Sequence, residues 1–376
     1  MTTGQPSPDA IVVGGGIIGC TLAYELQKRR IPTLLLEQGQ IGREASWATA
    51  GIIGPPSGED LPPHRADLAE RSQKRYEGLF QSIAQDTRLD TSYLRIGKVL
   101  VAFTESEVEM AQARVNWQIN HGFQANWIEP EDVREIEPTI PDNILGAYYT
   151  RDGGGLTGHR MTEAVADAFR NIGGHVMEYT AATGVLLDND RVTGVDTPDG
   201  PIHAGIVVLC AGAWTRFFGP SIHRALPVAP VKGQMIGVTP ESNGSRPRHV
   251  TGTISGGYVV PRVDGTVAVG ASLEHRGFDK RVTARAFDHA TTLMRKVSPA
   301  LLEAQFTSAW AGLRPGTDDD TPIMGPVPGC KGLWISTGHF RTGIQLAPGS
   351  AVLIAEAVAT GAADPLLEEF SLERFA

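Results

Sequence analysis

Short apolar runs and a longer amphipathic stretch alternate at the start of the chain. Residues 10–13 and 33–36 are apolar and partly β-branched, which is typical of strands buried on both faces of a sheet. Between them, residues 17–30 place Leu22 and Leu26 on one helical face. A strand, a helix and a second strand in this order predict a parallel βαβ unit.

The middle of the chain follows a second pattern. Four apolar segments between residues 228 and 271 (228–238, 249–254, 257–262 and 266–271) lack intervening helices, which predicts an antiparallel sheet. The predicted fold class is α/β for the Rossmann-like dinucleotide-binding domain. With the inserted antiparallel-sheet substrate domain, the chain as a whole is α+β. Elsewhere the patterns predict a terminal helix after residue 343, helices over residues 65–85, 105–120, 129–138, 161–170 and 283–297, and strands over residues 94–103, 176–180, 185–187, 192–196, 206–209 and 333–336.

The chain is too long, at 376 residues, for one small core, so two domains are expected. A hydrophobic content of 41% with 44 glycines is typical of a loop-rich α/β protein. The Rossmann-like domain is predicted to be discontinuous and to comprise residues 1–86, 146–222 and 316–376. Residues 87–145 and 223–315 form the predicted substrate-binding domain.

Charge and cysteine content exclude several classes of protein. The net charge of −9 is not concentrated in any run, so no nucleic-acid partner is expected. The 3 cysteines form no C-x-x-C pair and the 10 histidines show no ligand spacing, so neither dithiol chemistry nor a metal site is predicted. Residues 1–9 lack the features of a signal peptide, and no apolar run approaches the thickness of a bilayer. A cytoplasmic protein without a membrane partner is therefore expected.

A glycine motif follows the first predicted strand directly. Gly14, Gly16 and Gly19 fit the pattern G-x-G-x-x-G, in which glycines allow a tight turn, close approach of a pyrophosphate and close helix–strand packing. Glu37 ends the second strand, about 20 residues further on, where an acid can bind a ribose hydroxyl. The alternative is an ordinary glycine-rich turn, but strand, helix, strand and acid together favour a dinucleotide site.

A second match to this pattern begins at Gly153, in the sequence GGGLTG. Arg151 and Asp152 separate these glycines from the preceding apolar residues, so the tight strand–turn–helix geometry is lost. We interpret this segment as a connection between domains. Without a second nucleotide site or a C-x-x-C pair, the chain does not match the pyridine-nucleotide disulfide reductases.

Segments rich in small residues lie at the ends of predicted strands, at residues 14–19, 45–51, 211–213 and 338–343. Small residues let the backbone lie against a flat ligand, and Ser46 and Thr49 offer hydroxyls to phosphates. Their spread along the chain favours a long cofactor held end to end, and therefore FAD rather than NAD. The predicted cofactor-binding residues are Gly14, Gly16, Ile17, Ile18, Gly19, Glu37, Gln38, Ala45, Ser46, Thr49, Ala50, Gly51, Ile52, Val185, Gly212, Trp214, Gly338, His339, Phe340, Arg341, Thr342, Gly343, Ile344 and Gln345.

Six segments distributed from one end of the chain to the other carry a family resemblance. They are IVVGGGIIG with Glu37, SWATAGIIG, LPVAPVKGQ, GGYVVPR, SAWAGLRPGTDDDTPIMG and STGHFRTGIQLAPGSA. In this order they resemble the D-amino acid oxidase superfamily of flavoproteins, and within it the glycine oxidases of thiamine biosynthesis. The WAGLRPGT and GHFR-x-GI-x-LAP segments are the most specific of these.

The resemblance implies an FAD-binding domain that holds FAD noncovalently and the oxidative deamination of small amines. Glycine would yield glyoxylate, ammonia and hydrogen peroxide, with hydride passing from the α-carbon to flavin N5 and O2 reoxidising the flavin. Sarcosine and small D-amino acids are alternative substrates. No side chain need act as a strong base, because positioning supplies most of the effect. Relatives are often homotetramers, which is the reason to expect a homo-oligomer.

The resemblance and elementary chemistry together single out site residues. Arg314, in a predicted loop with the sequence GLRPG, is expected to bind the substrate carboxylate through its guanidinium fork, although a salt bridge is the usual role of an arginine. By resemblance, Tyr258 and Arg341 are expected in the substrate pocket, and Gly51 beside the isoalloxazine ring, where a side chain would limit substrate size. His339 is expected to be structural.

Residues at several positions leave the identity of the substrate undecided. Gln345 stands where the family has an aliphatic residue, Gly256 and Gly257 replace bulkier residues at the pocket entrance, and Leu273 holds an apolar place that limits substrate size in the family. One alternative is an FAD-dependent D-amino acid or secondary-amine dehydrogenase with a non-oxygen acceptor, and another is an FAD-binding protein without turnover. A covalent flavin is disfavoured because the GLRPGTDDD segment contains no cysteine.

Overall fold

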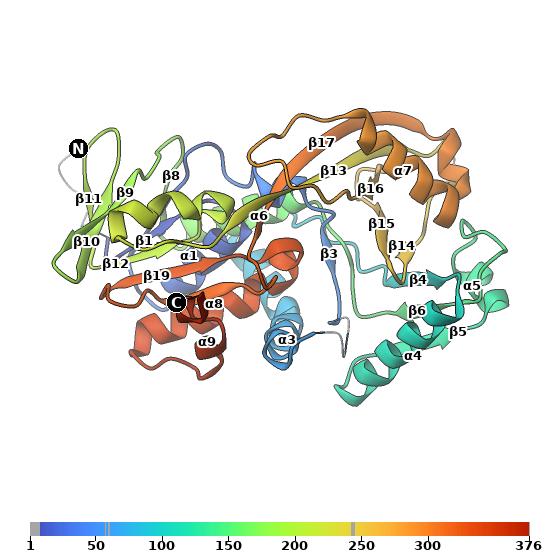
Figure 1. Cartoon of the computed structure of the whole chain (residues 1–376), viewed down its shortest axis with the longest axis horizontal. Helices are drawn as coiled ribbons and strands as arrows, with labels where there is room; N and C mark the ends of the chain where they lie inside the picture. The colour runs from blue at the N-terminus through green and yellow to red at the C-terminus, as the bar shows by residue number, and fades with distance from the viewer. Residues whose placement is uncertain (1–7, 57, 59–60, 242–244, 376) are drawn as a thin grey trace.

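The computed structural model describes residues 8–56, 58, 61–241 and 245–375. Residues 1–7, which carry most of the expectation that the chain lacks a signal peptide, lie outside this part. Two large sheets occupy opposite ends of the molecule, and the chain passes between them several times (Figure 1).

The first large sheet has six strands in the order β18-β19-β12-β1-β2-β8. β1 lies at its centre and pairs in parallel with β2 on one side and β12 on the other, and its four apolar residues are buried, as is typical of a parallel sheet covered on both faces. The helix α1, Ile17–Lys28, connects β1 to β2 and confirms the predicted βαβ unit. The six strands are β1 Ala10–Val13, β2 Thr33–Leu36, β8 His175–Met177, β12 Ile206–Leu209, β18 Ile323–Pro326 and β19 Leu333–Thr337.

Helices cover one face of this sheet, and a small sheet covers the other. Ala10 and Val12 pack with the helices, whereas Ile11 and Val13 pack with the small sheet, as the two-residue period of a strand requires. The helical face carries α1, α3 Pro63–Asp86, α6 Gly158–Asn171 and α8 Gly343–Thr360. The opposite face carries β9 Gly184–Asp188, β10 Arg191–Asp196, β11 Ile202–His203 and the 3-10 helix η1 Gly212–Ile222.

The second large sheet has eight strands in the order β17-β13-β16-β15-β14-β4-β6-β5. Val99 and Val101 face α7, Ala284–Val297, whereas Leu100 and Ala102 face α4, Glu105–Asn120, so a helix packs on each face. The strands are β4 Lys98–Ala102, β5 Ala125–Ile128, β6 Gly146–Thr150, β13 Ala229–Thr239, β14 Val250–Thr253, β15 Gly256–Pro261, β16 Val267–Gly270 and β17 Gln305–Gly316.

Short elements complete the described part of the chain. The longer helix α4 has the predicted bounds. The Thr104 hydroxyl caps its N-terminus by accepting a hydrogen bond from the Glu107 N–H at 3.3 Å. The short elements are α2 Ala45–Ala48, β3 Ile52–Ile53, α5 Pro130–Ile136, β7 Gly154–Gly155, η3 Pro299–Glu303, η4 Phe340–Thr342, α9 Leu366–Glu369 and η5 Leu372–Phe375.

Several predicted elements need correction. The segment around Arg314 is not a loop but the end of β17, which tolerates Pro315 because β17 is an edge strand. The predicted strand over residues 94–103 begins only at Lys98, since Leu94 forms an isolated bridge with Gly155. β4 and β14 pair in parallel, so the predicted antiparallel sheet is mixed.

One strand departs from the predicted domain division. Residues 146–150, predicted to belong to the Rossmann-like domain, form β6, which pairs with β4 and β5 in the eight-stranded sheet. In this register Ala147 lies beside Val101 on the face towards α7, and Tyr148 lies beside Leu100 on the face towards α4, so pairing with β4 buries both side chains. The chain returns to the first sheet after β7, through α6.

The last long helix corrects the statement about apolar runs. Residues 340–360 are long and apolar enough to cross a membrane by length and composition, and 67% of the most apolar window is buried inside the protein. α8 packs against α1 and α3 in the core (Figure 1). Its apolar character is therefore explained by packing on all sides.

Candidate active site

One cavity of about 610 Å³ runs between the two large sheets. Its first end lies where the parallel strands β1, β2, β12 and β19 finish, the usual position of a ligand in an open α/β sheet. Residues of β4, β13, β15 and β17 wall the other end. All four segments rich in small residues contribute to its lining.

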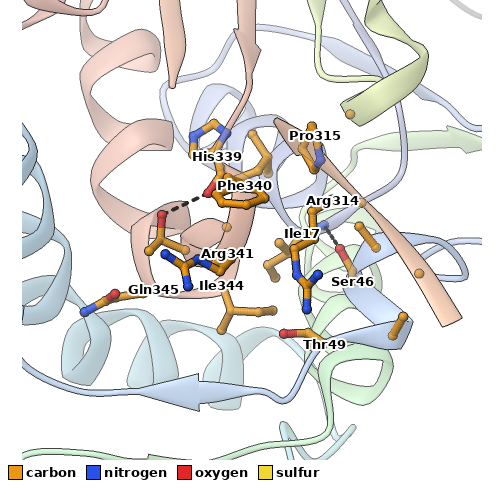
Figure 2. Close-up of a pocket in the computed structure, with 18 of the residues that line it drawn as sticks. Ile17, Ser46, Thr49, Arg314, Pro315, His339, Phe340, Arg341, Ile344 and Gln345 are labelled. Carbon is orange, nitrogen blue, oxygen red and sulfur yellow. Dashed lines mark hydrogen bonds between the residues drawn. The ribbon is translucent and has the colours of Figure 1, made fainter. Parts of the chain in front are cut away.

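Glycines close the turn between β1 and α1. Gly14 has φ +112°, and a Cβ there would lie 2.5 Å from the carbonyl oxygen of Cys210. A Cβ on Gly19 would lie 2.0 Å from the carbonyl oxygen of Gly14, so Gly19 brings α1 close to β1 but does not line the cavity. The Ile17 N–H donates to Ser46 Oγ at 2.9 Å (Figure 2). The Ser46 hydroxyl keeps its own proton for an anion at this positively polarised helix end.

Glu37 lies at the end of β2 with both carboxylate oxygens hydrogen-bonded. The Gly15 N–H donates to Oε2 at 2.7 Å, and the Gly39 N–H donates to Oε1 at 2.8 Å. Burial raises the pKa of Glu37, and these two hydrogen bonds oppose the rise. Each oxygen keeps a second lone pair, so the carboxylate can also accept from the hydroxyls of a ribose.

Most residues predicted to bind the cofactor line this cavity. The exceptions are Gly19, Gly51, Val185 and Gly338. Val185 is buried in β9, and Thr180 and Ala182, in the connection before β9, line the cavity instead. The lining residues that were predicted are Gly14, Gly16, Ile17, Ile18, Glu37, Gln38, Ala45, Ser46, Thr49, Ala50, Ile52, Gly212, Trp214, His339, Phe340, Arg341, Thr342, Gly343, Ile344 and Gln345.

Close contact with neighbouring backbone, and not the lining of the cavity, explains why residue 51 is a glycine. It has φ +77°, and a Cβ there would lie 1.9 Å from the carbonyl oxygen of Leu156. A side chain at this position would therefore collide with Leu156, which corrects the expectation that it would limit substrate size. Gly338 likewise has φ +75°, and a Cβ would meet Thr317 Cγ2 at 2.8 Å.

Arg314 extends from the end of β17 into the cavity (Figure 2). Its Nη1 donates to the Ser272 carbonyl at 3.1 Å, and among the described residues no carboxylate pairs with it. Burial, and then the positive charge of Arg341, lower the pKa of Arg314 to about 10, so the guanidinium stays charged near neutral pH. A Cβ on Gly233 would lie 2.3 Å from both Nη atoms, so the guanidinium lies flat against this glycine of β13. The remaining N–H groups have no hydrogen-bond partner within the described part of the chain and can bind an anionic ligand.

Tyr258 and Arg341 contact the same cavity. Tyr258, on β15, is 36% exposed, and Arg341 lies in η4 with its guanidinium 5.3 Å from the centre of the Phe340 ring. Gly257 lines the cavity, but a Cβ there would lie 2.8 Å from Leu293 on α7, so packing against this helix requires the glycine. Leu273 is 51% exposed and lies outside the cavity, so it does not limit substrate size here.

His339 is buried at the edge of the cavity and lies 3.0 Å, through Nε2, from Ser350 Oγ. Burial lowers the pKa of His339 to about 3, so the ring is uncharged near neutral pH. Nearby, Gln345 Nε2 donates to the Gly54 carbonyl at 2.7 Å. This amide links α8 to the segment after β3, a contact that an aliphatic residue cannot make.

Polar residues that no motif marked also line the cavity. They are Arg65 of α3, Lys98 of β4, and Arg114 and Gln118 of α4. In the sequence these are isolated polar positions within amphipathic segments, which usually face solvent. The packing of α4 on the eight-stranded sheet turns Arg114 and Gln118 towards the cavity instead.

Comparison with known proteins agrees with this geometry. Residues 9–357 match the family described as FAD dependent oxidoreductase (DAO). A glycine oxidase of Pseudomonas aeruginosa is 35% identical over 353 residues, covering 93% of this chain and 94% of the relative. The bifunctional protein ThiO/ThiG of Synechocystis sp. is 29% identical over 375 residues, covering 99% of this chain and 54% of the relative. The crystal structure of glycine oxidase from Geobacillus kaustophilus superposes with a TM-score of 0.89 at 28% identity, covering 98% of this chain and 99% of that one.

Proposed function

Because the chain belongs to the family of FAD-dependent oxidoreductases, we propose that this flavoenzyme is an amine oxidase of the glycine oxidase type. The proposed reaction converts glycine or another small amino acid, with O2 and water, to a 2-oxo acid, ammonia and hydrogen peroxide. The similarity to the glycine oxidase of Pseudomonas aeruginosa supports this reaction. The similarity to the bifunctional protein ThiO/ThiG supports a role in thiamine biosynthesis.

The cavity suits FAD along its length. The helix end at Ile17 and the Ser46 hydroxyl suit a diphosphate, and the Glu37 carboxylate suits a ribose. Small residues of α2 and of the turns after β12 and β19 leave room for flat rings. When bound, FAD supplies the two-electron acceptor for the amine.

The side chains at the other end position the substrate. Arg314 presents a charged guanidinium to the substrate carboxylate, and Gly233 behind it holds the plane of that group. Arg341 adds a second positive charge, which favours anionic over cationic ligands. Burial lowers the pKa of His339 to about 3, so this ring is a poor acceptor for the proton of the substrate ammonium.

A single observation carries the proposal: the Arg314 guanidinium is half-buried and charged, lies in the cavity, and has no carboxylate partner among the described residues. Such a group needs an anion from outside the chain. The test is to mix the FAD-loaded protein with glycine without oxygen and to follow the visible flavin band. We expect bleaching, with recovery and peroxide release in air.

Other outcomes of this experiment separate the alternatives. Bleaching by sarcosine or D-alanine but not by glycine would identify that amine as the substrate in place of glycine. Bleaching without recovery in air would favour a non-oxygen electron acceptor. An unchanged flavin band with every amine would overturn the proposed function.

A further inference from the structure

A second cation without a partner lines the cavity. Lys98 is the first residue of β4 and lies on the same face of that strand as Leu100, towards α4. Among the residues that the structure describes, it forms no hydrogen bond and no ion pair. Its ammonium group therefore has no compensation within the described protein, although burying such a group costs free energy.

Lys98 lines the cavity from the eight-stranded sheet, the same sheet that carries Arg314 and Tyr258. A Cβ on Gly54 would lie 2.8 Å from both Cε and Nζ of Lys98, so the lysine lies across this glycine. Gly54 also lines the cavity, and its carbonyl accepts the hydrogen bond from Gln345 at the start of α8. Lys98 therefore borders the segment of α8 that the cofactor is expected to contact.

The charges that line the cavity do not balance at this end. Among the described residues, the acids in the lining are Glu37 and Glu44, which both follow β2, and Glu44 forms an ion pair at 2.9 Å with a lysine outside the cavity. Arg314, Arg341 and Lys98 form no ion pair with described residues. A substrate with one carboxylate, bound to Arg314, would leave Lys98 uncompensated.

The neighbouring arginines differ from Lys98. Asp320 acts favourably on the charge of Arg65, and Arg114 lies over the ring of Tyr148 with its guanidinium carbon 5.5 Å from the ring centre. Burial, and then the charge of Arg114, lower the pKa of Lys98 to about 7. A bound carboxylate would favour the ammonium form and reverse this effect.

We propose that Lys98 binds a second carboxylate of the substrate, so that the preferred amine carries two carboxylates, one on Arg314 and one on Lys98. This inference rests on the proposed function and narrows its substrate class to amino or imino dicarboxylates. Lys98 is then a specificity-determining residue, which touches the distal end of the substrate.

Binding of unreactive anions tests the site without turnover. The FAD-loaded protein is titrated with acetate, malonate, succinate, glutarate and inorganic phosphate, and dissociation constants are read from the flavin difference spectrum. We expect at least one dicarboxylate to bind about tenfold or more tightly than acetate, and K98M to abolish this difference. K74M is the matched control, because Lys74 is an exposed lysine of α3 that pairs with Glu70 outside this cavity.

Turnover gives the second measurement. The ratio of kcat/KM for iminodiacetate and D-aspartate to that for glycine and D-alanine should fall about tenfold or more in K98M. K98R keeps the positive charge and should retain most of the preference for dicarboxylates. If it does, the loss of preference in K98M is due to the lost charge and not to a general loss of FAD or of folding. The K74M ratio should equal that of the wild type.

The outcomes distinguish this inference from the proposed function. If glycine reduces the flavin but K98M and wild type show the same dicarboxylate preference, only the inference is overturned. If no amine reduces the flavin but a dicarboxylate binds in a Lys98-dependent way, the proposed reaction is overturned and Lys98 is left as the binding site of a dicarboxylate that is not oxidised. Lys98-dependent binding of phosphate in preference to every dicarboxylate would overturn the inference and indicate a site for a free anion.

Discussion

At the scale of single residues, glycines decide where the charged side chains of the cavity can lie. Gly233 leaves room for the Arg314 guanidinium, which would lie 2.3 Å from a Cβ on that residue. Gly54 does the same for Lys98, at 2.8 Å. Neither relation can be read from spacing along the chain, because each joins two strands or segments that are distant in sequence.

Truncation of Arg314 tests the carboxylate site. R314A removes the N–H groups proposed to bind the substrate and leaves the dinucleotide end of the cavity intact. We expect kcat/KM for glycine to fall about 30- to 1,000-fold, mainly through KM, because truncating a buried charged partner costs about 2–5 kcal/mol. Steady-state kinetics and the flavin content of the preparation measure this, and unchanged kinetics would contradict the carboxylate role.

A methyl group behind Arg314 tests the positioning role of Gly233. G233A places a Cβ 2.3 Å from the guanidinium, so Arg314 must shift. We expect KM to rise about tenfold with little change in FAD content, since misplacing one charge-assisted contact costs roughly 1–2 kcal/mol. The control is G78A: nothing lies within 4 Å of a Cβ on Gly78 in α3, so this change should leave KM unaltered and stabilise the helix by about 0.5–1 kcal/mol. Equal KM values in G233A and wild type would refute the positioning role.

The pKa of Lys98 predicts a dependence of stability on pH. The pKa is lowered from 10.5 to about 7, so between these values the unfolded chain binds a proton that the folded chain releases. Lys98 therefore destabilises the fold increasingly as the pH falls from 10.5 to about 7, and by a constant amount below that. We expect K98M to raise the free energy of unfolding by about 2–4 kcal/mol at pH 7 and by much less at pH 10. Urea unfolding at fixed excess FAD checks this, and an equal gain at both pH values would be evidence against it.

At the scale of elements, hydrophobic periodicity locates α1, α4 and α7 well because each has one face on a sheet. It fails where pairing overrides local signals. Pro315 and Gly316 are typical of a loop, but at the edge of the sheet they continue β17. Residues 45–48 carry no helical signal in the sequence, yet they form the short helix α2, from which Ser46 reaches the start of α1.

The contact between α2 and α1 predicts the effect of S46A. The change removes the acceptor of the Ile17 N–H and a hydroxyl that faces the proposed diphosphate site. We expect the dissociation constant of FAD to rise about 5- to 30-fold, because losing a helix-cap hydrogen bond costs about 1–2 kcal/mol.

The matched control for S46A is T104A, which removes the N-cap of α4 far along the chain from the dinucleotide end. T104A should lower the melting temperature without changing FAD affinity. Reconstitution of the apoprotein with FAD measures both variants. If S46A lowered stability as T104A does and left FAD affinity unchanged, Ser46 would be a structural cap alone.

At the scale of the whole molecule, the cavity is assembled from both large sheets. The strand ends of the six-stranded sheet supply Glu37 and the glycine turn, while β4, β15 and β17 of the other sheet supply Lys98, Tyr258 and Arg314. This arrangement concentrates positive charge at one end of the cavity in a chain whose net charge is −9. Overall charge therefore says nothing about the sign of the ligand here.

Removal of FAD should weaken the molecule as a whole, because a ligand in this cavity contacts segments of both sheets. At FAD concentrations about 100 times the dissociation constant, binding stabilises the folded state by about 2.7 kcal/mol. We expect the melting temperature of the apoprotein to rise progressively with added FAD. A melting temperature independent of FAD would show that the cofactor binds elsewhere or equally well to the unfolded chain.

Much of the fold and part of the site follow from the sequence. Gly14, Gly16, Glu37 and the start of α8 belong to contiguous motifs in which local backbone geometry and chemistry act together, and they line the same cavity. Val185 and Leu273 were misplaced because a shift of one or two positions along a strand or turn changes the face on which a side chain lies. Gly51 was misinterpreted because a glycine required by a neighbouring backbone looks the same in sequence as one required by a ligand.

The sequence by itself determined the βαβ unit with its dinucleotide motif and the mixed α/β fold, whereas Arg314 was singled out by the family resemblance. The unit and the fold depend on periodicity and on residues close together in the chain. Only the tertiary structure decided that Arg314 lies against Gly233 with no acid among the described residues paired to it, and that Lys98 enters the same cavity. The physical reason is that charge compensation and close packing depend on neighbours from other strands, which no local pattern specifies.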